Sequence, residues 1–137
     1  MDRQLMLLPL LAQVLLTFFV GLLARLRRDK AVREGFNWRY FKTFEGELPP
    51  RYVLQSDQHF TNLFEAPMLF FAVGIISISL DTVDQILLIL AVLYVIFRCI
   101  HARISLTNNR LLWRGRSFII SCSLLLVMWI WIIYLNF

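Results

Sequence analysis

The sequence is poor in charged residues and in cysteine, and both shortages narrow the class of protein. Charged residues make up 17% of the 137 residues and hydrophobic residues 59%, which is too apolar for an ordinary soluble domain. The two cysteines, Cys99 and Cys122, form no CxxC motif and have no metal-ligand spacing. Both lie in apolar stretches, so we expect free, buried thiols and neither a disulfide nor a metal site.

The chain also lacks an internal repeat, a low-complexity run and the features of a cleavable signal peptide. Its apolar residues instead fall into four blocks long enough to span a bilayer, at about residues 4–24, 57–79, 83–106 and 117–134. The sequence therefore predicts an all-α integral membrane protein, with residues 1–137 forming a single four-transmembrane-helix bundle.

The charges are unevenly distributed between the predicted connections. Residues 25–51 and 107–116 are rich in arginine and lysine, whereas residues 79–84 hold two acids and no base. The positive-inside rule then puts both basic connections in the cytoplasm and both termini outside. The formal net charge of +5 is explained by topology and anionic lipid, so we expect no nucleic-acid partner.

The basic connection of residues 25–51 is interleaved with aromatic residues, a mixture typical of the headgroup level of a membrane. We expect this segment to lie partly on the membrane surface. Pro49 and Pro50 end it and favour an extended entry into the next helix.

Polar residues inside the second predicted span indicate a site. Asn62 and Glu65 are three residues apart and Gln58 lies one turn earlier, so a continuous helix puts them on one face. An acid at the centre of a spanning helix costs roughly 2.5–3.5 kcal/mol, so such groups persist where they face a partner or a wet cavity. Pro67 predicts a bend just beyond Glu65, and we expect Asp57 to be a helix N-cap.

The third predicted span carries a second polar face at a matching depth. Arg98, His101 and Ser105 are spaced by three and four residues near the cytoplasmic end. Arginines could bind carboxylates of a zwitterionic or anionic solute, and Glu65 could take an ammonium group. Three further arginines gather at the same level: Arg110, Arg114 and Arg116.

The same residues also allow interpretations that involve no binding site. Glu65 and Arg98 could form only an ion pair that joins helices or subunits. His59 and His101 could be interfacial residues without chemistry. The arginines of the second basic connection could be topology determinants that contact lipid phosphate.

The run Asn62-Leu63-Phe64-Glu65 followed by Pro67 resembles the motif of the MAPEG family, membrane-associated proteins in eicosanoid and glutathione metabolism. Arg98 and His101 near the end of the third span, and Arg116-Ser117 opening the fourth, match the same pattern. The resemblance covers essentially the whole chain and is strongest to bacterial members. It implies a homotrimer with a glutathione site between neighbouring subunits, facing the cytoplasm.

Carried onto this sequence, the resemblance implies a set of site residues. Glu65 would bind the amino end of glutathione, and Arg116 would stabilise its thiolate, with Arg114 and Arg110 as alternatives. Two positions depart from the family, since Gln58 stands where an arginine is usual and Ser105 where a tyrosine is common. The implied glutathione-binding set is Gln58, Asn62, Glu65, Arg98, His101, Ser105, Arg110, Arg114 and Ser117.

The leading hypothesis is a glutathione-dependent transferase or peroxidase in a bacterial inner membrane, acting on a lipophilic electrophile that arrives from the bilayer. No metal or general base is needed, because the thiolate is itself the nucleophile. The alternative is a non-enzymatic lipid- or small-anion-binding, or structural, membrane protein on the same scaffold. A small multidrug transporter is a third hypothesis, but residues 4–24 lack the acid that such a transporter needs in its first span.

Overall fold

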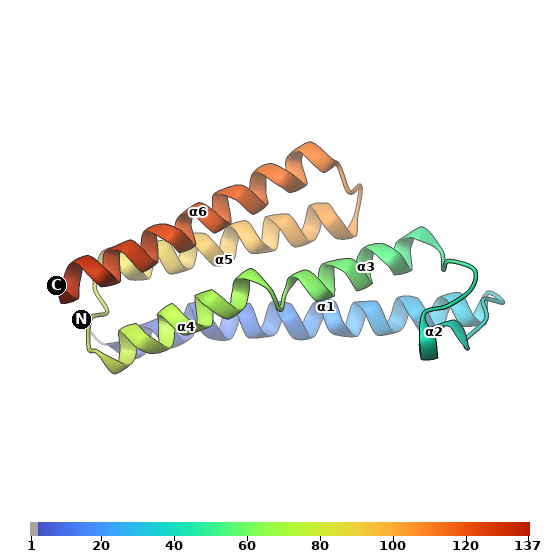
Figure 1. The fold of residues 1–137 in the computed structure, drawn as a ribbon, viewed down its shortest axis with the longest axis horizontal. Coiled ribbons are helices and arrows are strands. Elements are labelled where there is room, and N and C mark those ends of the chain that lie inside the picture. Colours follow the sequence, from blue (N-terminus) through green and yellow to red (C-terminus); the bar gives the residue numbers. More distant parts are fainter. Residues whose placement is uncertain (1–2) are drawn as a thin grey trace.

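The computed structural model describes residues 3–137, which form long helices packed side by side (Figure 1). A 3₁₀ turn, η1 (Arg3–Met6), leads into α1 (Leu7–Arg33), and the remaining helices are α2 (Tyr40–Thr43), α3 (Arg51–Asn62), α4 (Ala66–Ser79), α5 (Gln85–Leu106) and α6 (Leu111–Asn136). Within the described residues, four helical segments are long and apolar enough to cross a bilayer, with α3 and α4 together making the second. The predicted all-α, four-helix membrane architecture is therefore confirmed.

Both termini lie at one end of the bundle, together with the connection between α4 and α5 (Figure 1). The connection between α1 and α3, which contains α2, lies at the opposite end with the turn between α5 and α6. The two basic connections thus share one end, as the charge pattern predicts. That end is called the basic end below.

Helix α1 is longer than the apolar block that predicted it. Its 27 residues span about 40 Å at 1.5 Å per residue, against about 30 Å for the hydrocarbon core of a bilayer. The extra length is made by residues 25–33, the first part of the basic connection, which continue the helix before the chain leaves it. The aromatic part of that connection follows and contains the short helix α2.

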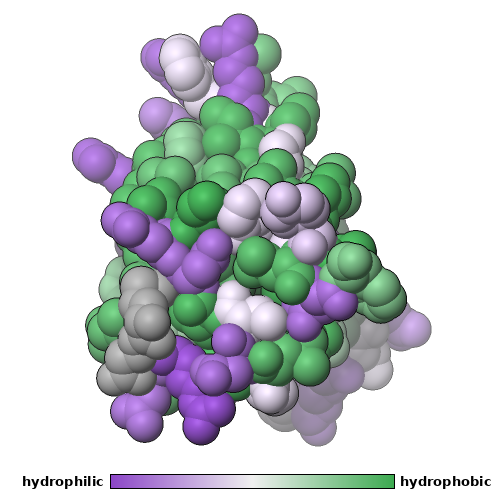
Figure 2. Space-filling view, turned by 90° about the vertical axis from the view of Figure 1, so that its left-hand side faces the viewer, coloured by the Kyte–Doolittle hydropathy of each residue, from purple (hydrophilic) through white to green (hydrophobic). Residues whose placement is uncertain are grey.

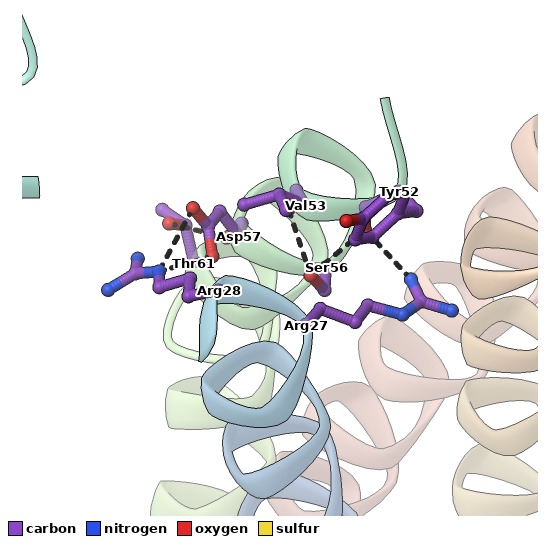
Figure 3. A network of polar contacts seen from close by, with 7 residues as sticks. All are labelled: Arg27, Arg28, Tyr52, Val53, Ser56, Asp57 and Thr61. Atoms are coloured by element: carbon purple, nitrogen blue, oxygen red, sulfur yellow. Dashed lines mark hydrogen bonds and ion pairs between the residues drawn. The ribbon is translucent and has the colours of Figure 1, made fainter. Parts of the chain in front are cut away.

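Two arginines near the end of α1 attach it to its neighbours (Figure 3). Arg27 donates to the carbonyl oxygen of Tyr52 at 3.0 Å, and its other terminal nitrogen donates to the carbonyl oxygen of Leu106, at the end of α5, at 2.9 Å. Arg28 donates through Nε to both carboxylate oxygens of Asp57, at 3.0 and 3.2 Å. One turn of α1 therefore holds the basic ends of α3 and α5 in place.

The expectation that Asp57 is a helix N-cap is wrong. Helix α3 begins at Arg51, directly after Pro50, whose ψ of 147° is extended. The prolines start the helix six residues earlier than the apolar pattern indicates, because an extended proline is a natural residue before a first helical turn. Asp57 therefore lies in mid-helix, where it pairs with Arg28.

The bend predicted at Pro67 is a complete break in the helix. Helix α3 ends at Asn62 and α4 begins at Ala66, and Glu65 occupies the N-cap position of α4 with φ −92° and ψ −98°. Pro67 falls in the first turn of α4, where its missing N–H is not needed. Asn62 and Glu65 consequently stand on either side of a break, and do not share a face of one continuous helix.

The buried apolar residues form two clusters. The larger one lies toward the termini and includes the stacked rings of Phe70 and Tyr94, whose centroids are 4.3 Å apart. The smaller one lies toward the basic end and includes Val20, Leu63 and Ala102. Many large apolar side chains remain exposed along the helices, as a lipid-facing surface requires. Figure 2 shows the end with the termini, where hydrophilic residues interrupt hydrophobic surface.

Candidate functional site

A cavity of about 320 Å³ lies between α3, α5 and the start of α6, on the basic side of the helix break. Five of the residues predicted from the sequence line it: Gln58, Asn62, His101, Ser105 and Arg114. The two polar helix faces predicted at matching depth therefore meet at one cavity. Four further residues complete its lining: His59, Leu111, Gly115 and Phe118.

Asn62 links the two charged residues of the site. Its side-chain oxygen accepts a hydrogen bond from Nη2 of Arg98 at 2.7 Å. Its side-chain nitrogen donates to Oε2 of Glu65 at 3.2 Å. Within residues 3–137 of one chain, Glu65 and Arg98 form no direct ion pair, and the amide of Asn62 links them instead.

Arg98 is the largest fully buried side chain, and its hydrogen-bonding capacity is only partly used. Its side chain has no solvent exposure, and neither Nε nor Nη1 has a partner within the described part of the chain. The nearby Tyr94 hydroxyl is also buried and has no hydrogen-bond partner among the described residues. Phe118 lies beside the guanidinium, with its ring centroid 5.9 Å from Cζ. A buried cation with free donors is costly, so this position favours a further acceptor from a ligand, a water or a partner.

His101 is held by the first turns of α6. Its Nδ1 lies 3.0 Å from the carbonyl oxygen of Arg114 and 3.3 Å from Oγ of Ser117. Ser117 itself donates to the same carbonyl at 2.9 Å. A carbonyl oxygen can only accept, so the bond to Arg114 requires the proton of the imidazole on Nδ1. The lone pair of the neutral ring is then on Nε2.

His59 faces His101 across the site, with ring centroids 5.2 Å apart. It is 2% exposed and both of its ring nitrogens lack a partner among residues 3–137. The sequence interpretation treated it as an interfacial residue without chemistry. Its position three residues before Asn62 is the signal that could have placed it on the cavity face, since residues three apart share a helix side.

The arginines near the start of α6 lie in different places. Arg114 lines the cavity, whereas Arg116 is exposed and lies over the ring of Trp113, with Cζ 5.2 Å from its centroid. Arg110 is exposed at the N-cap position of α6. Of the three arginines considered for stabilising a thiolate, Arg114 is the one that reaches the cavity of its own chain.

One glycine and two apolar residues of α6 also line the cavity, and the sequence did not predict them. A Cβ atom at Gly115 would have no atom within 4 Å, so this position opens the cavity. Leu111 and Phe118 flank it at helical spacings of four and three residues. Periodicity along α6 from Arg114 could have indicated Phe118, which is one turn further on.

No curated protein and no solved structure matches the chain. The model of the MAPEG family matches residues 6–134, which include all of α3, α4 and α5 and the cavity residues of α6. The protein, an integral membrane protein of four long apolar helices with a polar cavity at its basic end, belongs to the MAPEG family.

Proposed function

We propose that the protein is a glutathione-dependent transferase or peroxidase that acts on lipophilic electrophiles. The observation that carries the proposal is the cavity in which Asn62, His101 and Arg114 come together beside the buried Arg98. Membership of the MAPEG family supports a glutathione-related activity of this general type. The lipid-exposed helices give an apolar electrophile access from the bilayer.

Glutathione would bind with its charged groups among the polar side chains of the cavity. Glu65 and Arg98 do not line the cavity themselves, but both bond to Asn62, which does, and their charges are opposite in sign to those of the amino and carboxylate groups of the tripeptide. The volume of about 320 Å³ is at the lower end of the range of about 300–1,000 Å³ for small-molecule sites.

The thiolate would be stabilised by an arginine of α6. A cation beside a thiol favours the ionised form and so raises the fraction of nucleophile at neutral pH. In the cavity of a single chain this arginine is Arg114. Arg116, the arginine that the family resemblance favours, does not line this cavity and would act on a site completed by a neighbouring subunit.

We further propose a homotrimer in a bacterial inner membrane, with the basic end in the cytoplasm and both termini outside. The positive-inside rule supports the orientation, because both basic connections are at one end. A site between subunits is consistent with the free donors of Arg98, since a neighbouring chain or a ligand that bridges two chains would supply acceptors.

A second candidate function is binding of a lipid headgroup or another small anion without turnover. It is favoured by Gln58 and Ser105, which line the cavity where the family pattern has an arginine and a tyrosine, because each departure removes a contact implied for glutathione. Such a protein would keep the buried arginine and the amide bridge, and would not need Arg114 for chemistry.

The two functions are separated by conjugation of glutathione to a generic aryl halide by protein purified in detergent. The proposal predicts turnover above the detergent blank that falls sharply in Arg114→Ala. Cys99→Ser is the matched control, because Cys99 lies on α5 outside the cavity and, contrary to the expectation of a buried thiol, is exposed. The absence of turnover above the blank in the unaltered protein would reject the catalytic function.

A further inference from the structure

The structure identifies one ring nitrogen of the cavity that has the geometry of a base. His101 donates from Nδ1 to the carbonyl oxygen of Arg114, and this bond fixes the tautomer of the ring. Its Nε2 then carries a lone pair. Because His101 lines the cavity and its Nδ1 edge is turned to α6, the Nε2 edge is the one available to a ligand.

We propose that His101 is a catalytic base that accepts the thiol proton of glutathione through Nε2. The inference rests on the proposed function and adds to it the destination of the proton. The sequence indicated that an arginine is enough to generate the thiolate. An arginine stabilises the thiolate but cannot accept the proton that the thiol loses. A positioned imidazole supplies the missing acceptor.

The orientation of His101 is built into the end of α6. Ser117 donates to the carbonyl that His101 contacts and lies 3.3 Å from Nδ1, so the ring is held at its rear edge by a carbonyl and a hydroxyl. His101 is 5% exposed, and the rings of Phe118 and His59 lie at 5.6 and 5.2 Å between centroids. This packing leaves the ring few alternative orientations.

The charged and titratable groups that face His101 come from each element packed against it. Arg98 is on its own helix, Arg114 is on α6 and His59 is on α3. Glu65 is linked to Arg98 through the side chain of Asn62. The thiolate and the imidazolium formed by the transfer carry opposite charges, so the pair together adds no net charge to the cavity.

The step is a transfer of one proton followed by a substitution. The S–H bond breaks, its electron pair stays on sulfur, and the proton bonds to Nε2 of His101. The sulfur then forms a bond with the electrophilic carbon, and the leaving group departs with its electron pair. The imidazolium finally releases its proton to water, which restores the neutral ring.

The test follows the proton and the thiolate separately when protein in detergent and weak buffer is mixed with glutathione. Thiolate formation is read from its ultraviolet absorbance, and release of protons from an indicator dye. The proposal predicts thiolate without a matching release of protons, because His101 retains the proton until an electrophile reacts. S-methylglutathione should produce neither signal. Release of one proton per thiolate by the unaltered protein would overturn the proposal.

His101→Gln provides a second measurement, because glutamine keeps an N–H donor for the carbonyl of Arg114 but has no basic nitrogen. The variant should form thiolate at a rate lower by a factor of about 10² or more, the lower end of the usual range for a general base. It should retain the increase in thermal stability that glutathione gives. A wild-type rate of thiolate formation in the variant would overturn the proposal.

Cys99→Ser, outside the cavity, should behave as the unaltered protein in both measurements. If His101→Gln does not fold, the proton count on the unaltered protein decides. Failure of the unaltered protein to bind glutathione would reject the proposed function together with this inference. Binding and turnover accompanied by full release of the proton would reject the inference alone.

Discussion

Nη2 of Arg98 lies 2.7 Å from the side-chain oxygen of Asn62, and this bond connects a fully buried cation to the break between α3 and α4. The amide of Asn62 then donates to Glu65, which starts α4. Only a side chain with both an acceptor and a donor can make these two bonds at once. The break in the second span is thereby fastened to α5 at the edge of the cavity.

The first prediction tests this bridge by exchanging its acceptor and donor. Asn62→Asp places a second carboxylate beside that of Glu65. Adding Glu65→Gln supplies an amide that can donate to the new carboxylate. Glu65→Gln should therefore stabilise the Asn62→Asp variant, although it has no stabilising effect in the unaltered protein. The coupling should be about 0.5–3 kcal/mol in the free energy of unfolding, measured by a double-mutant cycle in detergent. Additive effects would show that the two side chains do not interact.

The second prediction concerns the arginines of α6. Arg114→Ala should lower kcat/KM by about 10²-fold, the lower end of what a single electrostatic contact to a developing charge contributes. Arg116→Ala should lower kcat/KM by less than about threefold when the site lies within one chain. The reason is that Arg116 lies over Trp113 and does not line the cavity. The comparison uses steady-state kinetics with one aryl halide. A larger loss in Arg116→Ala would mean that a neighbouring subunit brings Arg116 to the site.

The third prediction uses the open space at Gly115. Gly115→Leu should fill the cavity and abolish the thermal stabilisation by glutathione, and it should not destabilise the free protein. The reason is that no neighbouring atom lies within 4 Å of a Cβ at this position, and that leucine ranks next to alanine as a helix former, whereas glycine is about 0.8–1.0 kcal/mol less favourable than alanine. Gly115→Ala is the matched control and should still bind. Normal binding by the leucine variant would exclude this cavity as the ligand site.

The fourth prediction concerns the end of α1. Arg27→Ala should reduce the free energy of unfolding by about 2 kcal/mol, because it removes two hydrogen bonds from a charged group to carbonyl oxygens of α3 and α5. Arg25→Ala is the control, since Arg25 forms an exposed ion pair with Asp29 of the same helix, and its loss should cost less than about 1 kcal/mol. Chemical denaturation in detergent measures both. Equal losses would show that Arg27 does not fasten the bundle.

Much of the fold follows from the sequence for simple physical reasons. Apolar blocks of bilayer length can only be helices in lipid, because each backbone polar group needs an internal partner. The uneven arginine distribution then correctly puts the two basic connections at one end. Helical spacing pairs Gln58 with Asn62 and His101 with Ser105, and all four line one cavity.

The details that the sequence did not predict depend on contacts between helices. Pro67 predicts a disturbance in the second span, but whether the helix bends or breaks depends on what holds the freed groups, and here Arg98 holds Asn62. Asp57 has the sequence features of a cap, and its pairing with Arg28 depends on how far α1 extends. The direction of Arg114 and Arg116 depends on where α6 starts, because a shift of one residue rotates each side chain by about 100°.

The central claim, that glutathione binds in this cavity, is tested most directly by thermal unfolding of the protein with and without glutathione. A ligand that binds only the folded state at about 100 times its Kd adds roughly 2.7 kcal/mol, which raises the transition temperature measurably. The account predicts such a rise, and predicts that Glu65→Ala abolishes it. An unchanged transition temperature at saturating glutathione, with the unaltered protein folded, would contradict the account and favour the binding of a lipid or small anion.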